Sequence, residues 1–224
     1  MARIRNSKPK DSGDGYFRIL GNKKLGELIT KVQSTVTSAG TELERIIHEI
    51  LKHKGQLVEN VDIFLDKIPQ NNSIFVLSKK ALKKSKIIKF EKSEPDFVLL
   101  KISSKKCHII ELKEGYLFDT KKAAGEKLSL QNFENTIAKK IPFATSIHLC
   151  CFNCEDKTLI MQGLKQKFTE DEILTGREFC KLFEIEYDDI INKRNQDQKD
   201  NFDYFIEELL TIDSIKSLII EKLK

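Results

Sequence analysis

The chain has 224 residues, of which 40% are hydrophobic and 33% are charged, enough to bury the core of one large domain beneath a highly charged surface. No apolar stretch approaches the length that crosses a bilayer, the basic N-terminus lacks the apolar run of a secretory signal, and five cysteines fit reduced thiols better than a disulfide framework. The net charge of +5 is uneven, because residues 170–224 hold 8 Lys and Arg against 15 Asp and Glu. We therefore expect a cytoplasmic protein with no membrane partner, whose first three-quarters would attract a polyanion unless its lysines are only a solvated surface.

The start of the chain predicts a loose basic arm over residues 1–24, followed by a helix. Apolar residues at the spacing of an amphipathic helix line one face of the next segment: Leu43, Ile46, Ile47, Ile50 and Leu51. We expect this helix to begin near Thr41, with Glu44 at the capping-box position, and to end at Gly55.

The middle of the chain predicts helix, three strands, helix and strand. The two strands that matter most are joined by the short polar turn 103–106, which is typical of a hairpin. The expected ranges are a short helix over 73–82, strands over 87–90, 97–102 and 107–112, a helix over 129–140, and a buried strand over 146–152.

The last part of the chain predicts helices. Thr175 is expected to cap a helix that includes Phe183, and two further apolar stripes lie within 202–210 and 215–219. The sequence thus divides into the arm 1–24, a core domain 25–168, and a helical region 169–224 that packs on the core or forms a dimer interface.

Pro95-Asp96 and Glu111-Leu112-Lys113 carry the residue types that hydrolyse phosphodiesters. This reaction requires neutralisation of charge on the phosphate and an activated water, and Mg²⁺ held by one or two carboxylates provides both. Glu111 and Lys113 are two residues apart, so they share one face of a strand, whereas Leu112 points into the core. We expect Asp96, Glu111 and the Leu112 carbonyl to bind the metal, and Lys113 to position the attacking water.

These residues also have a purely structural interpretation. Asp96 would then cap a turn, and Glu111 and Lys113 would form a surface pair on the strand. This interpretation does not account for the way Glu111 and Lys113 interrupt the apolar run that starts at Cys107.

The segments Glu94–Val98 and Ile109–Lys113 resemble the catalytic hairpin of the PD-(D/E)xK nucleases, and within them the type II restriction endonucleases. The resemblance implies an α/β (α+β) fold with a restriction-endonuclease-like core, in which a mixed sheet of four to five strands is flanked by helices, with additional helices at both termini. It also implies that Glu44, at the edge of the apolar stripe, is a further acidic catalytic residue.

Two segments are candidates for contacts with DNA. The stretch Lys113–Glu126 resembles the loop that follows the catalytic lysine in several restriction endonucleases, with these candidate DNA ligands: Tyr116, Asp119, Thr120, Lys121 and Lys122. A lysine run could follow the DNA backbone or could form a solvated face: Lys79, Lys80, Lys83 and Lys84.

The resemblance implies Mg²⁺-dependent cleavage of both strands of double-stranded DNA by a homodimer in a bacterial or archaeal cytoplasm, paired with a DNA methyltransferase. Two alternatives remain open. The chain could be another nuclease of this superfamily that acts in repair, junction resolution or transposition, or it could be a DNA-binding module without catalysis.

Cys150, Cys151 and Cys154 include a C-x-x-C pattern, which can indicate zinc, but no second ligand pair follows. Buried thiols in a core strand are the favoured interpretation. His108 is an odd number of residues from Glu111, so it is expected to point to the opposite face of the sheet.

Overall fold

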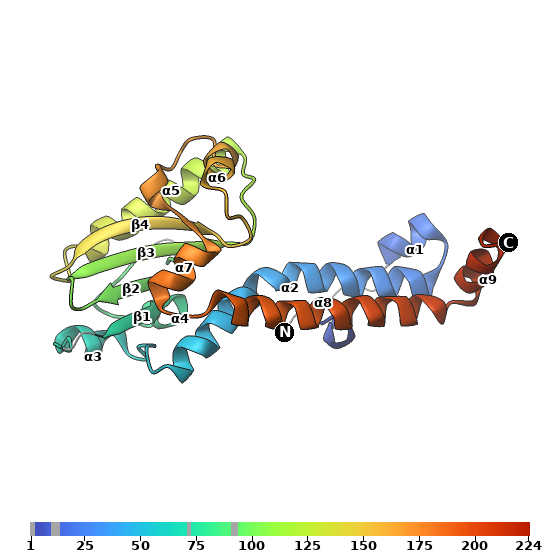
Figure 1. The fold of residues 1–224 in the computed structure, drawn as a ribbon, viewed down its shortest axis with the longest axis horizontal. Coiled ribbons are helices and arrows are strands. Elements are labelled where there is room, and N and C mark those ends of the chain that lie inside the picture. The colour runs from blue at the N-terminus through green and yellow to red at the C-terminus, as the bar shows by residue number, and fades with distance from the viewer. Residues whose placement is uncertain (1–2, 10–13, 71–72, 91–93) are drawn as a thin grey trace. The chain divides into compact units, whose positions relative to one another are not determined.

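The described residues form one five-stranded sheet, of which Figure 1 labels β1 to β4. The computed structural model describes residues 3–9, 14–70, 73–90 and 94–224. The sheet has the order β1-β2-β3-β4-β5, with β1, β2 and β3 antiparallel and β3, β4 and β5 parallel. The strands are β1 (Ile74–Ser78), β2 (Phe97–Lys101), β3 (Lys106–Lys113), β4 (Ala144–Cys151) and β5 (Ile173–Thr175). The expected fold class, a mixed sheet flanked by helices, is confirmed.

The chain divides into two units, one formed by residues 1–45 with 188–224 and the other by residues 46–187. The second unit contains the sheet and the shorter helices α3 (Val61–Asp66), α4 (Lys79–Leu82), α5 (Thr120–Ile137), α6 (Lys157–Gly163) and α7 (Gly176–Phe183). The first unit contains α1 (Asp14–Leu20), most of α2 (Lys23–His53) and α8 (Tyr187–Leu210), and α9 (Asp213–Lys222). These boundaries differ from the sequence-based division at residues 24 and 168.

The first unit is more ordered than the sequence indicated. Residues 14–20 form α1 where a loose arm was expected, and Ile4 is buried beside an ion pair between Arg3 and Asp197 at 2.7 Å. Lys31 of α2 donates to the Tyr204 hydroxyl of α8 at 3.3 Å. None of the helices in the described ranges has the length and apolar character needed to cross a membrane.

Helix α2 begins eighteen residues before the predicted start at Thr41. The Thr41 hydroxyl donates to the Ser38 carbonyl within the helix, so Thr41 is not a cap. The end of the helix was predicted correctly, because Gly55 follows it with a φ of 68°, a conformation that glycine adopts without strain.

Three predictions for the middle of the chain were wrong. Residues 74–78 form strand β1 rather than a helix, because their run of Ile, Phe, Val and Leu fits a buried strand, and residues 87–90 form no strand. Phe90 instead packs edge-on against Phe133 at 5.3 Å. Helix α5 starts at Thr120 rather than at 129, since Asp119 caps it by accepting a hydrogen bond from Lys122 N at 2.8 Å.

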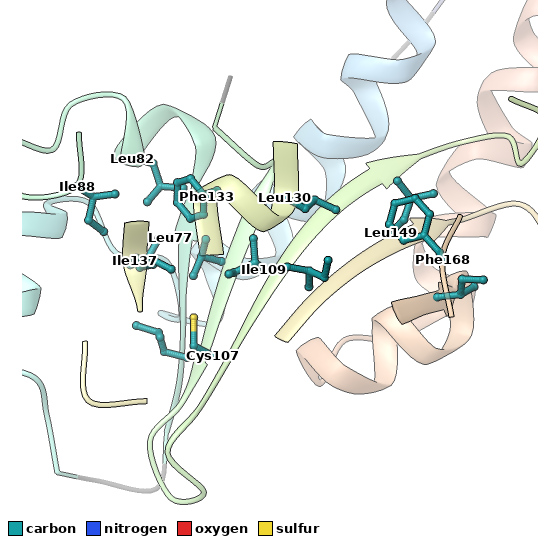
Figure 2. Close-up of a cluster of buried hydrophobic side chains, with 14 of the residues drawn as sticks. Leu77, Leu82, Ile88, Cys107, Ile109, Leu130, Phe133, Ile137, Leu149 and Phe168 are labelled. Carbon is teal, nitrogen blue, oxygen red and sulfur yellow. The ribbon is translucent and has the colours of Figure 1, made fainter. Parts of the chain in front are cut away.

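Both faces of the sheet are covered by apolar side chains. On one face, α5 contributes Leu130, Phe133 and Ile137 to a core with Ile109 and Leu149, as Figure 2 shows. On the other face, two aromatic side chains of α7 pack near Phe97: Phe179 at 6.0 Å and Phe183 at 5.7 Å between centroids. The predicted cap of α7 is confirmed, because Thr175 and Glu178 form a capping box.

We predict that Gly176→Ala destabilises the protein. A Cβ at Gly176 would lie 2.3 Å from the carbonyl oxygen of Phe152, the residue after β4, so α7 would have to move away from Phe152. We expect a loss of about 1–3 kcal/mol in the free energy of unfolding, measured by chemical denaturation. The control is Gly125→Ala inside α5, where a Cβ meets nothing within 4 Å and the helix should gain up to about 1 kcal/mol. Equal effects at the two glycines would contradict the argument.

Candidate active site

Asp96 lies directly before β2 and is held on both of its carboxylate oxygens. Oδ2 accepts the backbone N–H of Leu112 at 2.9 Å, and Oδ1 accepts the ammonium of Lys79 at 2.9 Å. Its side chain is only 3% exposed. The sequence predicted Asp96 as a candidate ligand, but it did not indicate that the neighbouring strand and helix α4 would both contact it.

Glu111 faces Asp96 across the β2–β3 hairpin. The register pairs Phe97 with Ile110, so the next pair toward the open end is Asp96 and Glu111, on the same face of the sheet. Burial raises the pKa of Glu111 to about 7, and repulsion from the Asp96 carboxylate is the second cause of this rise. The two carboxylates therefore form a partly buried site of concentrated negative charge.

Lys113 lies two residues beyond Glu111 on β3 and neutralises part of this charge. Its Nζ lies 2.8 Å from Glu111 Oε1 and 2.9 Å from Glu126 Oε1. Burial lowers the pKa of Lys113, but the attraction of the two glutamates outweighs burial, so the pKa is raised. Lys113 therefore stays an ammonium at neutral pH, suited to orienting a water or a phosphate oxygen rather than accepting a proton.

Glu126 is a residue of this site that the sequence analysis missed. It lies in the second turn of α5 and reaches back to Lys113 on β3. The signal that could have revealed Glu126 is the helix cap at Asp119. If α5 is recognised to begin after Asp119, Glu126 falls in the second turn of the helix, close to the end of β3 where Lys113 lies.

The donor set fits a hard divalent cation. Within the described ranges no three His, Cys, Asp or Glu side chains are arranged to hold a metal ion. Mg²⁺, however, is usually held by only one or two carboxylates, with waters and phosphate oxygens as its other ligands. The carbonyl oxygen of Leu112 is a third possible metal ligand. The N–H of Leu112 points toward Asp96, and in a strand the C=O of the same residue points to the same side. No β2 residue lies opposite Leu112, so this carbonyl is not used in the β2–β3 ladder.

Glu44 is half-buried on α2 and belongs to the other unit, residues 1–45 with 188–224. It has interaction partners of its own. Its predicted catalytic role stays a prediction.

Lys80 of α4 and Lys84 after it line a pocket. The pocket has a volume of about 580 Å³, and Ser78, Lys80 and Lys84 contribute to its wall. The remaining lining residues come from the end of α2 and the segment after it, together with Ala81: His48, Lys52, Gly55, Leu57, Val58 and Glu59. Three lysines and a histidine against one glutamate make the pocket electropositive, and Ser78 and Lys80 flank the Lys79 that holds Asp96. Lys83 is exposed.

The segment after β3 is partly helical, which changes the roles of its predicted DNA ligands. Asp119 caps α5, and Thr120, Lys121 and Lys122 are exposed in its first turn. Lys121 and Lys122 thus place positive charge at the N-terminus of α5, where Asp119 already accepts the Lys122 N–H. The backbone carbonyl and the ring of Tyr116 pack against Gly163. A Cβ at position 163 would lie 2.2 Å from the Tyr116 carbonyl oxygen.

The chain is 40% identical over 226 residues to the Type II restriction enzyme HhaII of Haemophilus parahaemolyticus, in a match that covers 96% of this chain and 97% of that protein. No family model matches the chain, and no solved structure matches it. Identity at this level along almost the whole of both chains indicates common descent.

The chain belongs to the family of type II restriction enzymes.

Within the described part of the chain, the cysteines and His108 of this restriction enzyme make no ion pair or hydrogen bond with the acidic side chains of the site, although Cys151 on β4 is the strand partner of Lys113 on β3. Cys150, Cys151 and Cys154 are buried free thiols, as favoured from the sequence, and burial raises the pKa of Cys151 to about 12. His108 points to the face opposite Glu111, as predicted, and its Nδ1 lies 3.0 Å from Nε2 of His148.

The histidine pair forms a chain of hydrogen bonds with a defined direction. His148 Nδ1 lies 3.1 Å from the Asp171 carbonyl and must donate to it, because a carbonyl only accepts. His148 Nε2 is then an acceptor, so His108 Nδ1 donates to it, and Ser146 Oγ lies 3.1 Å and 3.0 Å from the two nitrogens. Burial lowers the pKa of His108 to about 4, with repulsion from the neighbouring imidazole as the second cause.

We predict that this pair makes the enzyme less stable as the pH falls from about 6.5 to about 4. The unfolded chain binds a proton to His108 below its ordinary pKa of 6.5, whereas the folded chain resists protonation down to about 4. Because the ring is partly exposed, we expect a contribution of about 1–2 kcal/mol. The Glu111 pKa, raised to about 7, acts with the opposite sign, since the folded state binds that proton more readily.

The measurement is therefore a comparison of variants. We expect His108→Asn to show a smaller loss of unfolding free energy between pH 6.5 and pH 4 than the unchanged enzyme. His53→Asn, at an exposed position, should behave as the unchanged enzyme. Parallel pH profiles for all three proteins would contradict the assignment.

Proposed function

We propose that this restriction enzyme hydrolyses phosphodiester bonds in both strands of double-stranded DNA at a short specific site, with Mg²⁺ bound between Asp96 and Glu111. The observation that carries the proposal is that one hairpin brings these two carboxylates and Lys113 close together, in a chain related to HhaII. The relationship favours restriction over repair, junction resolution, transposition or DNA binding without cleavage.

Each residue of the site has a role that follows from its surroundings. Asp96, Glu111 and the Leu112 carbonyl would hold Mg²⁺, which supplies charge neutralisation at the scissile phosphate and a polarised water. Lys113, an ammonium fixed by Glu126, would hold the attacking water and a phosphate oxygen in line for attack. Glu44 is proposed as an additional acidic residue.

The DNA backbone is proposed to follow the positive groups around this site. Lys80 and Lys84 at the pocket, with Lys83 beside them, and Thr120, Lys121 and Lys122 at the start of α5 would contact phosphates. Tyr116 would support that segment through its packing on Gly163. Asp119 would act through the helix that it caps, because its carboxylate already accepts the Lys122 N–H.

A homodimer is proposed because the described part of the chain holds one such acidic site and two strands must be cut. The first unit offers apolar surface for such contacts on α8 and α9: Phe202, Ile206, Leu210, Leu218 and Ile220 are exposed. Sedimentation velocity should then give a particle of twice 25.9 kDa. We further propose that a cognate DNA methyltransferase protects the host DNA.

Digestion of a plasmid of known sequence in the presence of Mg²⁺ tests the proposal directly. Discrete fragments whose ends map to one recurring short sequence would support site-specific cleavage. A smear of fragments would indicate a nonspecific nuclease, and intact plasmid at all metal and protein concentrations would contradict the proposal.

We predict that Asp96→Asn and Lys113→Ala each reduce the rate of DNA cleavage by about 10²- to 10³-fold or more while DNA binding persists. The amide oxygen introduced by Asp96→Asn can still accept the Leu112 N–H, so this change removes charge with little effect on the hairpin. Cleavage is followed by gel electrophoresis and binding by fluorescence anisotropy. The control is Lys139→Ala at an exposed position after α5, which should keep the full rate.

We predict that Lys80→Ala and Lys84→Ala weaken DNA binding through phosphate contacts. Each substitution should reduce the slope of log affinity against log salt concentration by about 1, and the loss should be similar for specific and nonspecific DNA. Titrations at several salt concentrations measure this slope. An unchanged slope in both variants would leave the pocket without a role in DNA binding.

A further inference from the structure

Lys79 lies opposite Asp96 at the point where β1 ends. The β1–β2 register pairs Ser78 with Phe97, so the next pair is Lys79 and Asp96. The Lys79 backbone N–H donates to the Asp96 carbonyl at 3.0 Å, and its Nζ donates to Oδ1 at 2.9 Å. Ser78 caps α4 by accepting the Ala81 N–H at 3.3 Å, which fixes the backbone from which the Lys79 side chain extends.

The ammonium of Lys79 thus lies on the carboxylate oxygen of Asp96 that has no backbone hydrogen bond among the described residues. Asp96 Oδ2 is already engaged by the Leu112 N–H, which leaves Oδ1 for a second partner. A buried carboxylate without a partner is strongly destabilising, and Lys79 supplies the counter-charge of Asp96. The Lys79 side chain is 29% exposed against 3% for Asp96, and its flexible stem can move outward.

We propose that Lys79 is a resident counter-ion of Asp96 that a divalent cation displaces when it binds between Asp96 and Glu111. The inference rests on the proposed function of that site. Each carboxylate carries its own ammonium, Lys79 on Asp96 at 2.9 Å and Lys113 on Glu111 at 2.8 Å. A cation near Oδ1 repels the ammonium of Lys79, so metal binding includes the cost of breaking one ion pair. Lys79 therefore sets the cation affinity of the site.

The test is the affinity of the full chain for Ca²⁺ and Mg²⁺ without DNA, measured by isothermal titration calorimetry. We expect Lys79→Met to bind both ions about three- to tenfold more tightly, the effect of removing one partly exposed competing charge. Lys79→Arg keeps a cation and should bind close to the unchanged protein. The matched control Lys106→Met removes one charge from the exposed start of β3 and should leave the affinity unchanged.

Asp96→Asn separates the inference from the proposed function. If this variant binds Ca²⁺ as tightly as the unchanged protein, the metal site itself is wrong. If it loses Ca²⁺ binding but Lys79→Met binds no more tightly than the unchanged protein, the metal site stands and the counter-ion role of Lys79 is overturned.

A second measurement needs no removal of the lysine charge. Nuclear magnetic resonance of the unchanged protein, labelled with ¹⁵N in its lysine side chains, follows each ion-paired ammonium group. The Lys79 signal is assigned by its absence in Lys79→Arg. We expect it to shift or broaden as Ca²⁺ fills the site, and a Lys79 signal that stays constant to saturation contradicts displacement.

Discussion

A hydrogen bond of 2.9 Å from the Leu112 backbone N–H to Asp96 Oδ2 joins the two halves of the acidic hairpin. It ties the residue that precedes β2 to the part of β3 that extends past the β2 ladder, between Glu111 and Lys113. Because this contact fixes Asp96 beside Glu111, it also creates the repulsion that, together with burial, raises the Glu111 pKa to about 7. The same hydrogen bond therefore sets the geometry of the proposed metal site and brings the two carboxylates close enough to repel each other.

The balance of charge around this contact explains why the site needs lysines as well as carboxylates. Lys79 and Lys113 each neutralise one carboxylate, and Glu126 holds Lys113 from the opposite element, α5. In this network each carboxylate has an ammonium partner when no metal is bound. Two carboxylates without lysines would have no counter-charge in the absence of metal. When a divalent cation and a DNA phosphate bind, the carboxylates would exchange an ammonium partner for the cation, and the lysines would exchange a carboxylate for the phosphate.

The alternation of side chains along β3 separates the acidic site from the histidine pair. Glu111 and Lys113 point to the face covered by α5, whereas His108 points to the other face and pairs with His148. The two faces respond to pH with opposite signs, since a buried neutral imidazole resists protonation and a buried carboxylate accepts it. Neither histidine takes part in the acidic site, although His108 is close to Glu111 in the chain.

The sequence by itself determined the two strands of the acidic hairpin and the candidates Asp96, Glu111 and Lys113, because strand periodicity and residue type are local properties. It missed β1, the start of α5 and the long extent of α2, where local patterns fit more than one structure. Only the tertiary structure brought Lys79 to Asp96 and Glu126 to Lys113, since these contacts depend on strand register and on the point where a helix begins. Ion pairs between distant elements leave no periodic signal in a chain that is 33% charged.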